Sequence, residues 1–182
     1  MKKTYVLDTN VLIQAPYAVE CFEENTVVLP MTVLEELDNM KKEEGEKGAN
    51  VRKVIRILDA HREKGNLLEG VRMEWGGILR VEKNYRNVEL PPDLPEHKSD
   101  NRILKVCVGL SNDLKEQVIL VTKDILLRIK AQLLGIQAED FGTEQVAVHE
   151  EQYLGRREVF VPEELFKDFK EKGSSGRMCI LL

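Results

Sequence analysis

The chain begins with a short apolar strand that runs directly into three polar residues, and this junction constrains the fold more than any other feature. Residues 4–7 favour a strand, and Asp8, Thr9 and Asn10 follow at once, before an apolar stretch resumes at 11–13. In a parallel α/β sheet, ligands bind outside the carboxyl ends of the strands. Asp8 is therefore expected where such a sheet places its functional groups.

The rest of the chain alternates short apolar runs with amphipathic stretches. The continuous run at 118–121 is typical of a parallel strand that is buried on both faces, and apolar residues at helical spacing mark 51–58. We expect strands at 4–7, 26–29, 118–121 and 136–138, and helices at 11–22 (interrupted by Pro16), at 31–40, from 51 to about 64, from Ser99 and at 125–134. This alternation predicts an α/β fold with a parallel sheet.

Three segments depart from the alternation. Residues 67–82 alternate apolar and charged residues around Gly76–Gly77, which predicts an inserted β-hairpin with a glycine turn. Residues 84–98 hold three prolines and no periodicity, so a loop is expected there. The charged run at 41–48 is interpreted as a solvated connection.

The pattern changes again near residue 145. A strand at 156–161 and a helix at 162–170 are predicted, followed by a flexible Gly-Ser stretch. We therefore expect one compact domain over residues 1–145 and a C-terminal extension or linker, partly flexible, over 146–182.

Composition limits the classes of function. A formal net charge of −5 and a pI near 5.4 argue against a protein that grips nucleic acid through bulk positive charge. Nucleic acid stays possible because bound cations reverse the local field of an acidic site. Three scattered cysteines indicate a reducing compartment. No run approaches the ~18 apolar residues of a membrane helix and no secretory segment precedes Asp8, so we expect a cytoplasmic protein without a membrane partner.

Four acidic residues form the candidate site, although they are far apart in the sequence. Asp8 and Asp124 each follow a buried strand, and Asp100 and Glu36 lie in the early turns of helices. In a parallel sheet, strand ends and helix starts share one rim. Taken singly, each acid is also explained as a helix cap or as a solvated helix residue.

Taken together, the four acids predict a metal site. Carboxylates gathered on one rim repel one another unless a cation lies between them, and an oxygen-only ligand set suits Mg²⁺ or Mn²⁺. Such ions activate water and stabilise charge on a phosphoryl group. Phosphodiester hydrolysis is the chemistry that this arrangement favours.

Four motifs follow one another along the chain: Asp8-Thr9-Asn10, Pro30-x-x-Val33-x-x-Glu36-Leu37, Asp100-x-x-Ile103-Leu104 and Thr122-x-Asp124. In this order they resemble the motifs of the PIN-domain nucleases, over about residues 4–145. A narrower resemblance is to the N-terminal PIN domain of bacterial PhoH-like ATPases, which share the Ser99–Leu104 segment, the hairpin and proline-rich insertion before it, and the helix around 128–131.

The resemblance implies a three-layer αβα sandwich that cleaves single-stranded RNA with Mg²⁺ or Mn²⁺, and that self-associates as a homo-oligomer. Asn10 and Thr122 would support the site through hydrogen bonds to ligands, water or substrate. By motif, the metal-binding carboxylates would be Asp8, Glu36, Asp100 and Asp124.

Three basic residues near the Asp124 rim are candidates for phosphate contacts. They are Lys123, Arg128 and Lys130. Positioning contacts to nucleic acid usually come from basic side chains, but ordinary solvated helix charges explain these residues equally well.

Two other hypotheses stay open. PhoH-like proteins continue into an ATPase, and this chain has no GxxxxGK[ST] phosphate loop. It is therefore expected to be a piece of a longer protein or a free-standing domain, and a non-catalytic module that binds RNA or a partner and regulates an attached ATPase is the alternative function. A haloacid-dehalogenase-type phosphatase also begins with a strand-end Asp, but it would carry a second Asp where this chain has Asn10.

Overall fold

The computed structural model describes residues 2–85 and 87–142, which contain a six-stranded sheet in the order β3-β4-β2-β1-β5-β6. Five strands run parallel, and the short β3 pairs antiparallel with β4. The strands are β1 Lys3–Leu7, β2 Thr26–Pro30, β3 Val71–Arg72, β4 Ile78–Glu82, β5 Gln117–Val121 and β6 Gln137–Glu139. The predicted α/β class with a mostly parallel sheet is confirmed.

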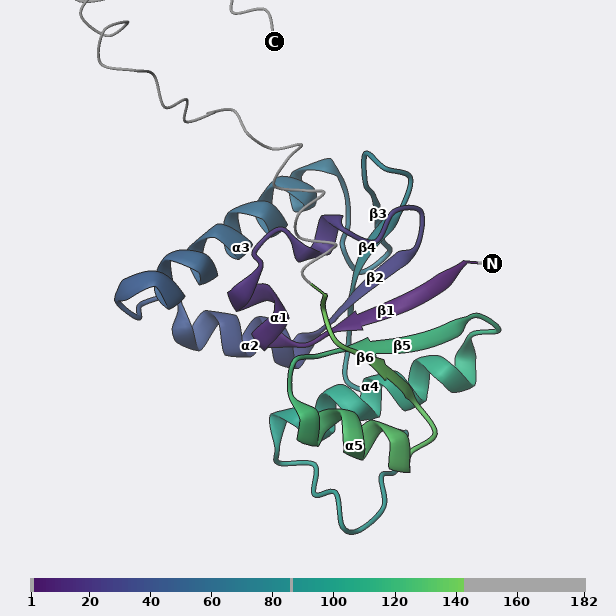
Figure 1. Ribbon diagram of the computed structural model, residues 1–182. Helices are drawn as coiled ribbons and strands as arrows, with labels where there is room; N and C mark the ends of the chain where they lie inside the picture. Colours follow the sequence, from purple (N-terminus) through teal and green to yellow (C-terminus); the bar gives the residue numbers. More distant parts are fainter. Residues whose placement is uncertain (1, 86, 143–182) are drawn as a thin grey trace, which may run out of the picture. The chain divides into compact units, whose positions relative to one another are not determined.

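Helices cover both faces of the sheet, which gives the three-layer αβα arrangement. Figure 1 shows α1 and α3 on one side and α4 and α5 on the other, and α2 packs against both α3 and α4. This follows from right-handed crossovers, because the chain moves outward from β1 in one direction first and in the opposite direction later. The helices are α1 Thr9–Gln14, a 3₁₀ turn at Ala18–Glu20, α2 Met31–Met40, α3 Gly45–Lys64, α4 Ser99–Asp113 and α5 Ile125–Leu133.

The three central strands supply the middle of the core. Val6 and Leu7 of β1, Val28 of β2 and Leu120 of β5 are fully buried. Consecutive residues of one strand point to opposite faces, so burial of both Val6 and Leu7 means that helices cover this strand on both sides. This explains why the strands read as continuous apolar runs instead of alternating ones.

The strand order creates a topological switch point next to β1, where successive connections leave the strand in opposite directions along the sheet. From β1 the chain goes to β2 on one side, and it later returns to β5 on the other. Leu7 is in register with Val121, and the Asp8 amide donates to the Val121 carbonyl at 3.0 Å. Because ligands of open α/β sheets bind at such switch points, the residues that follow β1 and β5 occupy the favoured position.

Two helix boundaries differ from the expectation. The helix predicted over 11–22 ends at Gln14, and a 3₁₀ turn follows after Pro16, which cannot supply the backbone donor of a continuing helix. The connection predicted at 41–48 is shorter than expected, because α3 already begins at Gly45. The difference matters because it brings the first turn of α3 close to the site.

The predicted hairpin and loop are both present. The strands β3 and β4 flank a turn in which the Met73 amide donates a 2.8 Å hydrogen bond to the Gly77 carbonyl, and Gly76 adopts a φ of +88° that favours glycine. The strand expected at 156–161, the helix expected at 162–170 and the boundary expected at 145 all lie outside the described residues.

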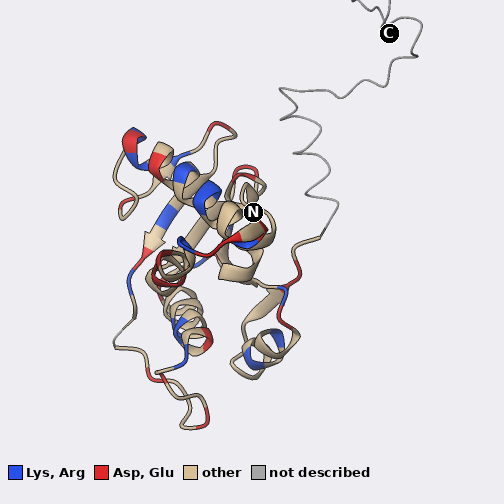
Figure 2. Cartoon of the chain, turned by 90° about the vertical axis from the view of Figure 1, so that its left-hand side faces the viewer, with Lys and Arg blue, Asp and Glu red and all other residues tan. Residues whose placement is uncertain are grey.

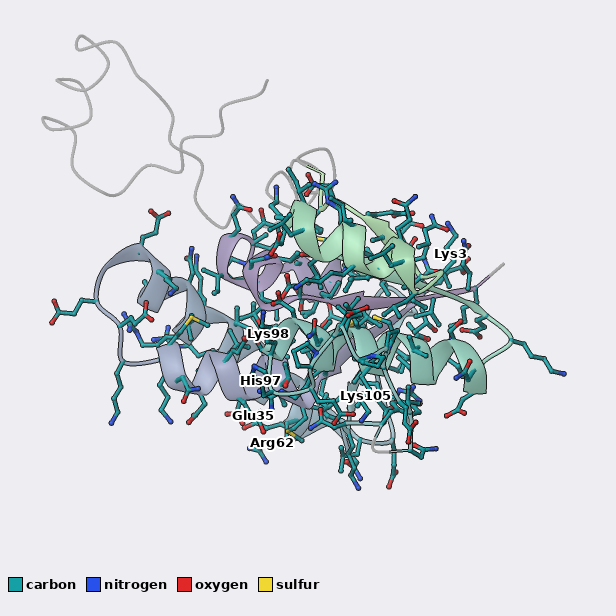
Figure 3. The ribbon with its side chains drawn as sticks, turned by 90° about the horizontal axis from the view of Figure 1, so that it is seen from below. Lys3, Glu35, Arg62, His97, Lys98 and Lys105 are labelled. Carbon is teal, nitrogen blue, oxygen red and sulfur yellow. The ribbon has the colours of Figure 1, made fainter. Side chains whose placement is uncertain are left out.

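The proline-containing loop is fixed against α4. Lys105 of α4, labelled in Figure 3, is almost completely buried, and its ammonium contacts Glu96 Oε1 at 2.5 Å. Asn101 donates a 2.8 Å hydrogen bond to the Pro95 carbonyl. Because α4 begins where this loop ends, these contacts hold the first turn of α4, which carries Asp100.

Charge is mixed over the described part of the chain. Figure 2 shows Lys and Arg interspersed with Asp and Glu along α3 and around the sheet. Among residues 2–85 and 87–142, no helix combines the length and the apolar character needed to cross a bilayer.

Candidate functional site

The four acids expected to form the site line a single pocket of about 380 Å³ at the carboxyl ends of β1 and β5. They come from four different elements, so only the tertiary fold brings them together. The pocket is lined by Asp8, Thr9, Asn10, Ile13, Glu36, Asn39, Met40, Lys47, Asp100 and Asp124.

Asp8 is the most buried of the four acids, with 5% of its surface exposed. It caps α1, where Oδ1 accepts a 2.6 Å hydrogen bond from the Thr9 amide, and Oδ2 accepts one of 2.6 Å from the Thr122 hydroxyl. Burial raises the pKa of Asp8 to about 6; these two hydrogen bonds oppose the rise, and the nearby charges of Glu36 and Asp100 add to it.

Thr122 and Asn10 connect the ends of β5 and β1. The Thr122 hydroxyl, which donates to Asp8, also accepts a 3.0 Å hydrogen bond from the Asp124 amide and one of 3.5 Å from Asn10 Nδ2. Asn10 Oδ1 accepts from the Lys123 amide at 3.3 Å. Thr122 therefore contacts both Asp8 and Asp124, and Asn10, which lines the pocket, connects to them through Thr122 and the Lys123 amide.

Asp124 lines the pocket and also caps α5. Its Oδ1 accepts hydrogen bonds from the amides of Leu126 at 2.7 Å and Leu127 at 3.4 Å. The capping role that explains this acid on its own is therefore present, and it coexists with a position on the pocket wall.

Glu36 and Asp100 approach the pocket from the helices α2 and α4. The Thr9 hydroxyl donates a hydrogen bond to Glu36 Oε2, which joins the start of α1 to α2. Asp100 Oδ2 accepts a 3.2 Å hydrogen bond from the ammonium of Lys130 on α5, with which it forms an ion pair. Each of these carboxylates thus has a donor from a different element.

The three basic residues proposed for phosphate contacts have different surroundings. Lys130 pairs with Asp100, and Lys123 lies 3.8 Å from Asp140, a residue that does not line the pocket. Nε of Arg128 is buried and has no hydrogen-bond partner among the described residues. None of the three side chains lines the pocket wall. Lys130 is connected to the pocket by its ion pair with Asp100, which does line it.

Sequence reasoning missed three polar residues of the pocket. Thr9 was noted without a role, although its hydroxyl holds Glu36. Asn39 follows Glu36 by three positions, so the helical spacing placed both on one face of α2. Lys47 was hidden in a charged run that was interpreted as a connection, and no local signal marked it as part of α3.

The four pocket acids supply the carboxylate oxygens that a hard divalent cation prefers. Their side chains, however, are not gathered closely around one point. Mg²⁺ and Mn²⁺ favour carboxylate oxygens. The neighbouring Glu36 and Asp100 help to raise the pKa of the buried Asp8, and a cation between these carboxylates would relieve that repulsion. Within residues 2–85 and 87–142, no three His, Cys, Asp or Glu side chains converge closely enough to hold an ion. The acids therefore surround a common space without forming a finished coordination shell.

Comparison with known proteins agrees with this architecture. The model of the PIN domain family matches residues 5–142. The protein PhoH2 of Bacillus subtilis is 46% identical over 178 residues, which cover 94% of this chain and 40% of that protein. The protein PhoH2 of Mycolicibacterium smegmatis is 39% identical over 149 residues, which cover 80% of this chain and 34% of that protein.

A solved structure of low sequence identity also aligns with most of this chain. A PilT N-terminus domain protein of Sulfolobus solfataricus aligns with 87% of this chain and 99% of its own, at 14% identity and a TM-score of 0.43. This chain spans less than half the length of the PhoH2 proteins that it matches. The family model, the curated relatives and the placement of the acids lead to one conclusion: the chain belongs to the PIN-domain family.

Proposed function

We propose that this domain is a metal-dependent endoribonuclease that hydrolyses phosphodiester bonds of single-stranded RNA, with Mg²⁺ or Mn²⁺ as its cofactor. The observation that supports this most is the convergence of four carboxylates, from four separate elements, on one pocket at the switch point of the sheet. Membership of a family whose fold is generally that of a nuclease agrees with it.

Asp8, Glu36, Asp100 and Asp124 are the residues that would hold the cation. When bound, the ion supplies a Lewis acid that lowers the pKa of water and stabilises charge on the phosphoryl group. Asp8 is ionised above its pKa of about 6, and Thr122 and Thr9 hold its two oxygens in place. In-line attack by water on the phosphodiester leaves 5′-phosphate and 3′-hydroxyl ends.

Substrate binding in this proposal depends on local positive charge. The acidic pocket repels the RNA backbone unless a cation compensates it, and basic side chains around the rim then position the phosphates. Lys123, Arg128 and Lys130 are assigned this role from the sequence, and we add Lys47 because it lines the pocket.

The test is a metal titration of RNA cleavage. Purified protein is incubated with a labelled single-stranded RNA over a range of Mg²⁺ and Mn²⁺ concentrations and with EDTA, and both product ends are analysed. We expect metal-stimulated cleavage that is lost in Asp8→Asn and Asp100→Asn. Asp59→Asn, which removes an exposed acid of α3 outside the pocket, is the matched control and should cleave normally. Equal cleavage by wild type and Asp8→Asn would refute the proposal.

A non-catalytic role is the second candidate, and one observation favours it. No three acids among the described residues converge on a common ion position. In that case the domain binds RNA or a partner and regulates a PhoH-type ATPase in a longer chain, and the greater length of its relatives is compatible with this. RNA binding without metal-stimulated cleavage would support this candidate.

The family assignment removes the basis for the phosphatase hypothesis.

We further propose that the chain forms a homo-oligomer through α5. Side chains on this helix with exposures between 50% and 77% form an apolar stripe at its surface, made up of Ile125, Leu126, Ile129 and Leu133. A patch of four such side chains presents on the order of 500 Å², and two copies packed together reach the roughly 1,000 Å² that a specific interface needs.

We place the protein in the cytoplasm. Cys21 and Cys107 are free thiols among the described residues, and a reducing compartment preserves such thiols.

A further inference from the structure

The pocket carboxylates are compensated in two different ways. Asp8 accepts hydrogen bonds from an amide and a hydroxyl, Glu36 accepts one from a hydroxyl, and Asp124 accepts them from amides. All of these donors are neutral. Among the described residues, Asp100 differs from the other three pocket acids because it forms an ion pair, with Lys130 of α5.

The ion pair between Lys130 and Asp100 has the features of an exchangeable contact. The ammonium lies 3.2 Å from Asp100 Oδ2, and the two side chains are 27% and 40% exposed. Ion pairs with this much access to water contribute little to folding. The buried pair of Lys105 and Glu96, in which the lysine side chain is 7% exposed, is the contrasting structural contact on the same helix.

Lys130 supplies positive charge to Asp100, a carboxylate that a bound metal ion would also use. A divalent cation that uses the oxygens of Asp100 competes with the ammonium for the same carboxylate. The backbone of α5 stays fixed, because Asp124 caps the helix and Leu127 and Ala131 are buried. A displaced ammonium therefore remains beside the pocket, where it can act as a point charge for an RNA phosphate.

We propose that Lys130 is a placeholder cation: it neutralises Asp100 while the metal is absent, lowers the metal affinity of the site by competition, and contacts a substrate phosphate once Asp100 is taken by the metal. The phosphate contact rests on the proposed nuclease function, whereas the competition does not.

The first experiment measures Mn²⁺ binding by isothermal titration calorimetry, without RNA. Lys130→Gln removes the competing charge, and we expect its Mn²⁺ affinity to rise roughly three- to tenfold, in line with an exposed ion pair. Lys130→Arg keeps a positive charge and should bind like the wild type. Lys123→Gln removes the same charge from the same rim without touching a pocket carboxylate, so its affinity should change less. Circular dichroism verifies that the variants are folded.

The second experiment measures RNA cleavage at saturating Mn²⁺. We expect Lys130→Gln to lower kcat/KM about tenfold in spite of its tighter metal binding, and a variant that binds metal better but cleaves worse is not expected from a purely structural bridge. Unchanged or weaker Mn²⁺ binding by Lys130→Gln overturns the competition, whether or not the protein is a nuclease. Unchanged cleavage overturns the phosphate contact. If the wild type cleaves no RNA while Lys130→Gln binds Mn²⁺ more tightly, the proposed function fails and the competition stands.

Discussion

The hydroxyl of Thr122 donates a 2.6 Å hydrogen bond to Oδ2 of Asp8, across the ends of two adjacent parallel strands. The same hydroxyl accepts a hydrogen bond from the Asp124 amide, so the Thr122 oxygen contacts two of the four pocket acids. Burial raises the pKa of Asp8, and this hydrogen bond is the largest of the effects that lower it. Thr122 therefore holds the carboxylate of the most buried acid in place and favours its ionised form.

Replacing Thr122 tests this control directly. Thr122→Val preserves the shape of the side chain but removes the donor, so we expect the pKa of Asp8 to rise above its value of about 6. Thr122→Ser retains the hydroxyl and should titrate like the wild type. The carboxyl ¹³C resonance of Asp8, followed by NMR against pH in metal-free buffer, reports the pKa. An unchanged midpoint in Thr122→Val would show that the hydrogen bond does not stabilise the ionised form.

Neutralising Asp8 is expected to stabilise the metal-free fold. The pKa rises from 3.8 to about 6 on folding, so the folded state binds the proton more tightly than the unfolded state. The wild type consequently loses stability as the pH rises between these two values, by about 3 kcal/mol in total. Asp8→Asn avoids this loss and should unfold several degrees higher at pH 7.5.

The pH dependence provides the check on this expectation. The difference in melting temperature between Asp8→Asn and the wild type should shrink below pH 6 and vanish near pH 4, where both side chains are neutral. Added Mn²⁺ should stabilise the wild type and have a smaller effect on the variant. A lower melting temperature for Asp8→Asn at pH 7.5 without metal would contradict the burial argument.

Removing the hydroxyl of Thr9 should weaken metal binding. Thr9→Val deletes the donor to Glu36 while the Thr9 amide still contacts Asp8, so the changed partner is Glu36. A carboxylate without its supporting hydrogen bond is a poorer ligand, and losses of 10–100-fold in metal affinity are typical. Calorimetry with Mn²⁺ measures the change, and Thr9→Ser should restore the affinity. Equal affinities for the Val and Ser variants would exclude this role.

The part of the site that the sequence reveals follows from the geometry of parallel sheets. Asp8 and Asp124 follow apolar runs, and parallel strands end at a common edge, so their proximity is predictable without any coordinates. Asp100 and Glu36 lie in the early turns of helices that start at the same edge. Their residue types and positions are sufficient to predict a shared pocket, which the structure contains.

The other features of the site depend on tertiary contacts, which cannot be predicted from the local sequence. The partner of Lys130 is 30 positions away, and the packing of α5 against α4 selects it. Lys47 belongs to a run of Gly, Lys and Glu without apolar periodicity. Arg52 of the same helix donates to the carbonyls of Lys41 and Glu43 at 3.1 Å each, which ties the residues before α3 to the helix. Local propensity alone favours a connection there.

This close turn before α3 leads to an expectation that runs against helix propensity. Gly48 lies in the first turn of α3 and is buried, and a Cβ added to it would meet the Glu43 carbonyl oxygen at 1.8 Å. Ala normally stabilises a helix relative to Gly, but here the backbone of Glu43 must move. We expect Gly48→Ala to lower the free energy of unfolding by about 1–3 kcal/mol. Urea denaturation measures it, and Lys53→Ala on the exposed face of the same helix should stay within about 0.5 kcal/mol of the wild type.

The apolar stripe of α5 makes the proposed self-association testable at one position. Leu133 is 77% exposed and is the stripe residue farthest along the chain from Asp124. A charge placed there is buried twice in a two-fold interface, once by each copy, so Leu133→Lys should weaken dimerisation at least tenfold. Sedimentation velocity over a concentration series measures the assembly. Leu68→Lys, which adds the same charge at an exposed leucine outside α5, should assemble like the wild type. If both variants self-associate equally well, α5 is not the interface; if the wild type is a monomer at every concentration, the stripe does not bind a second copy.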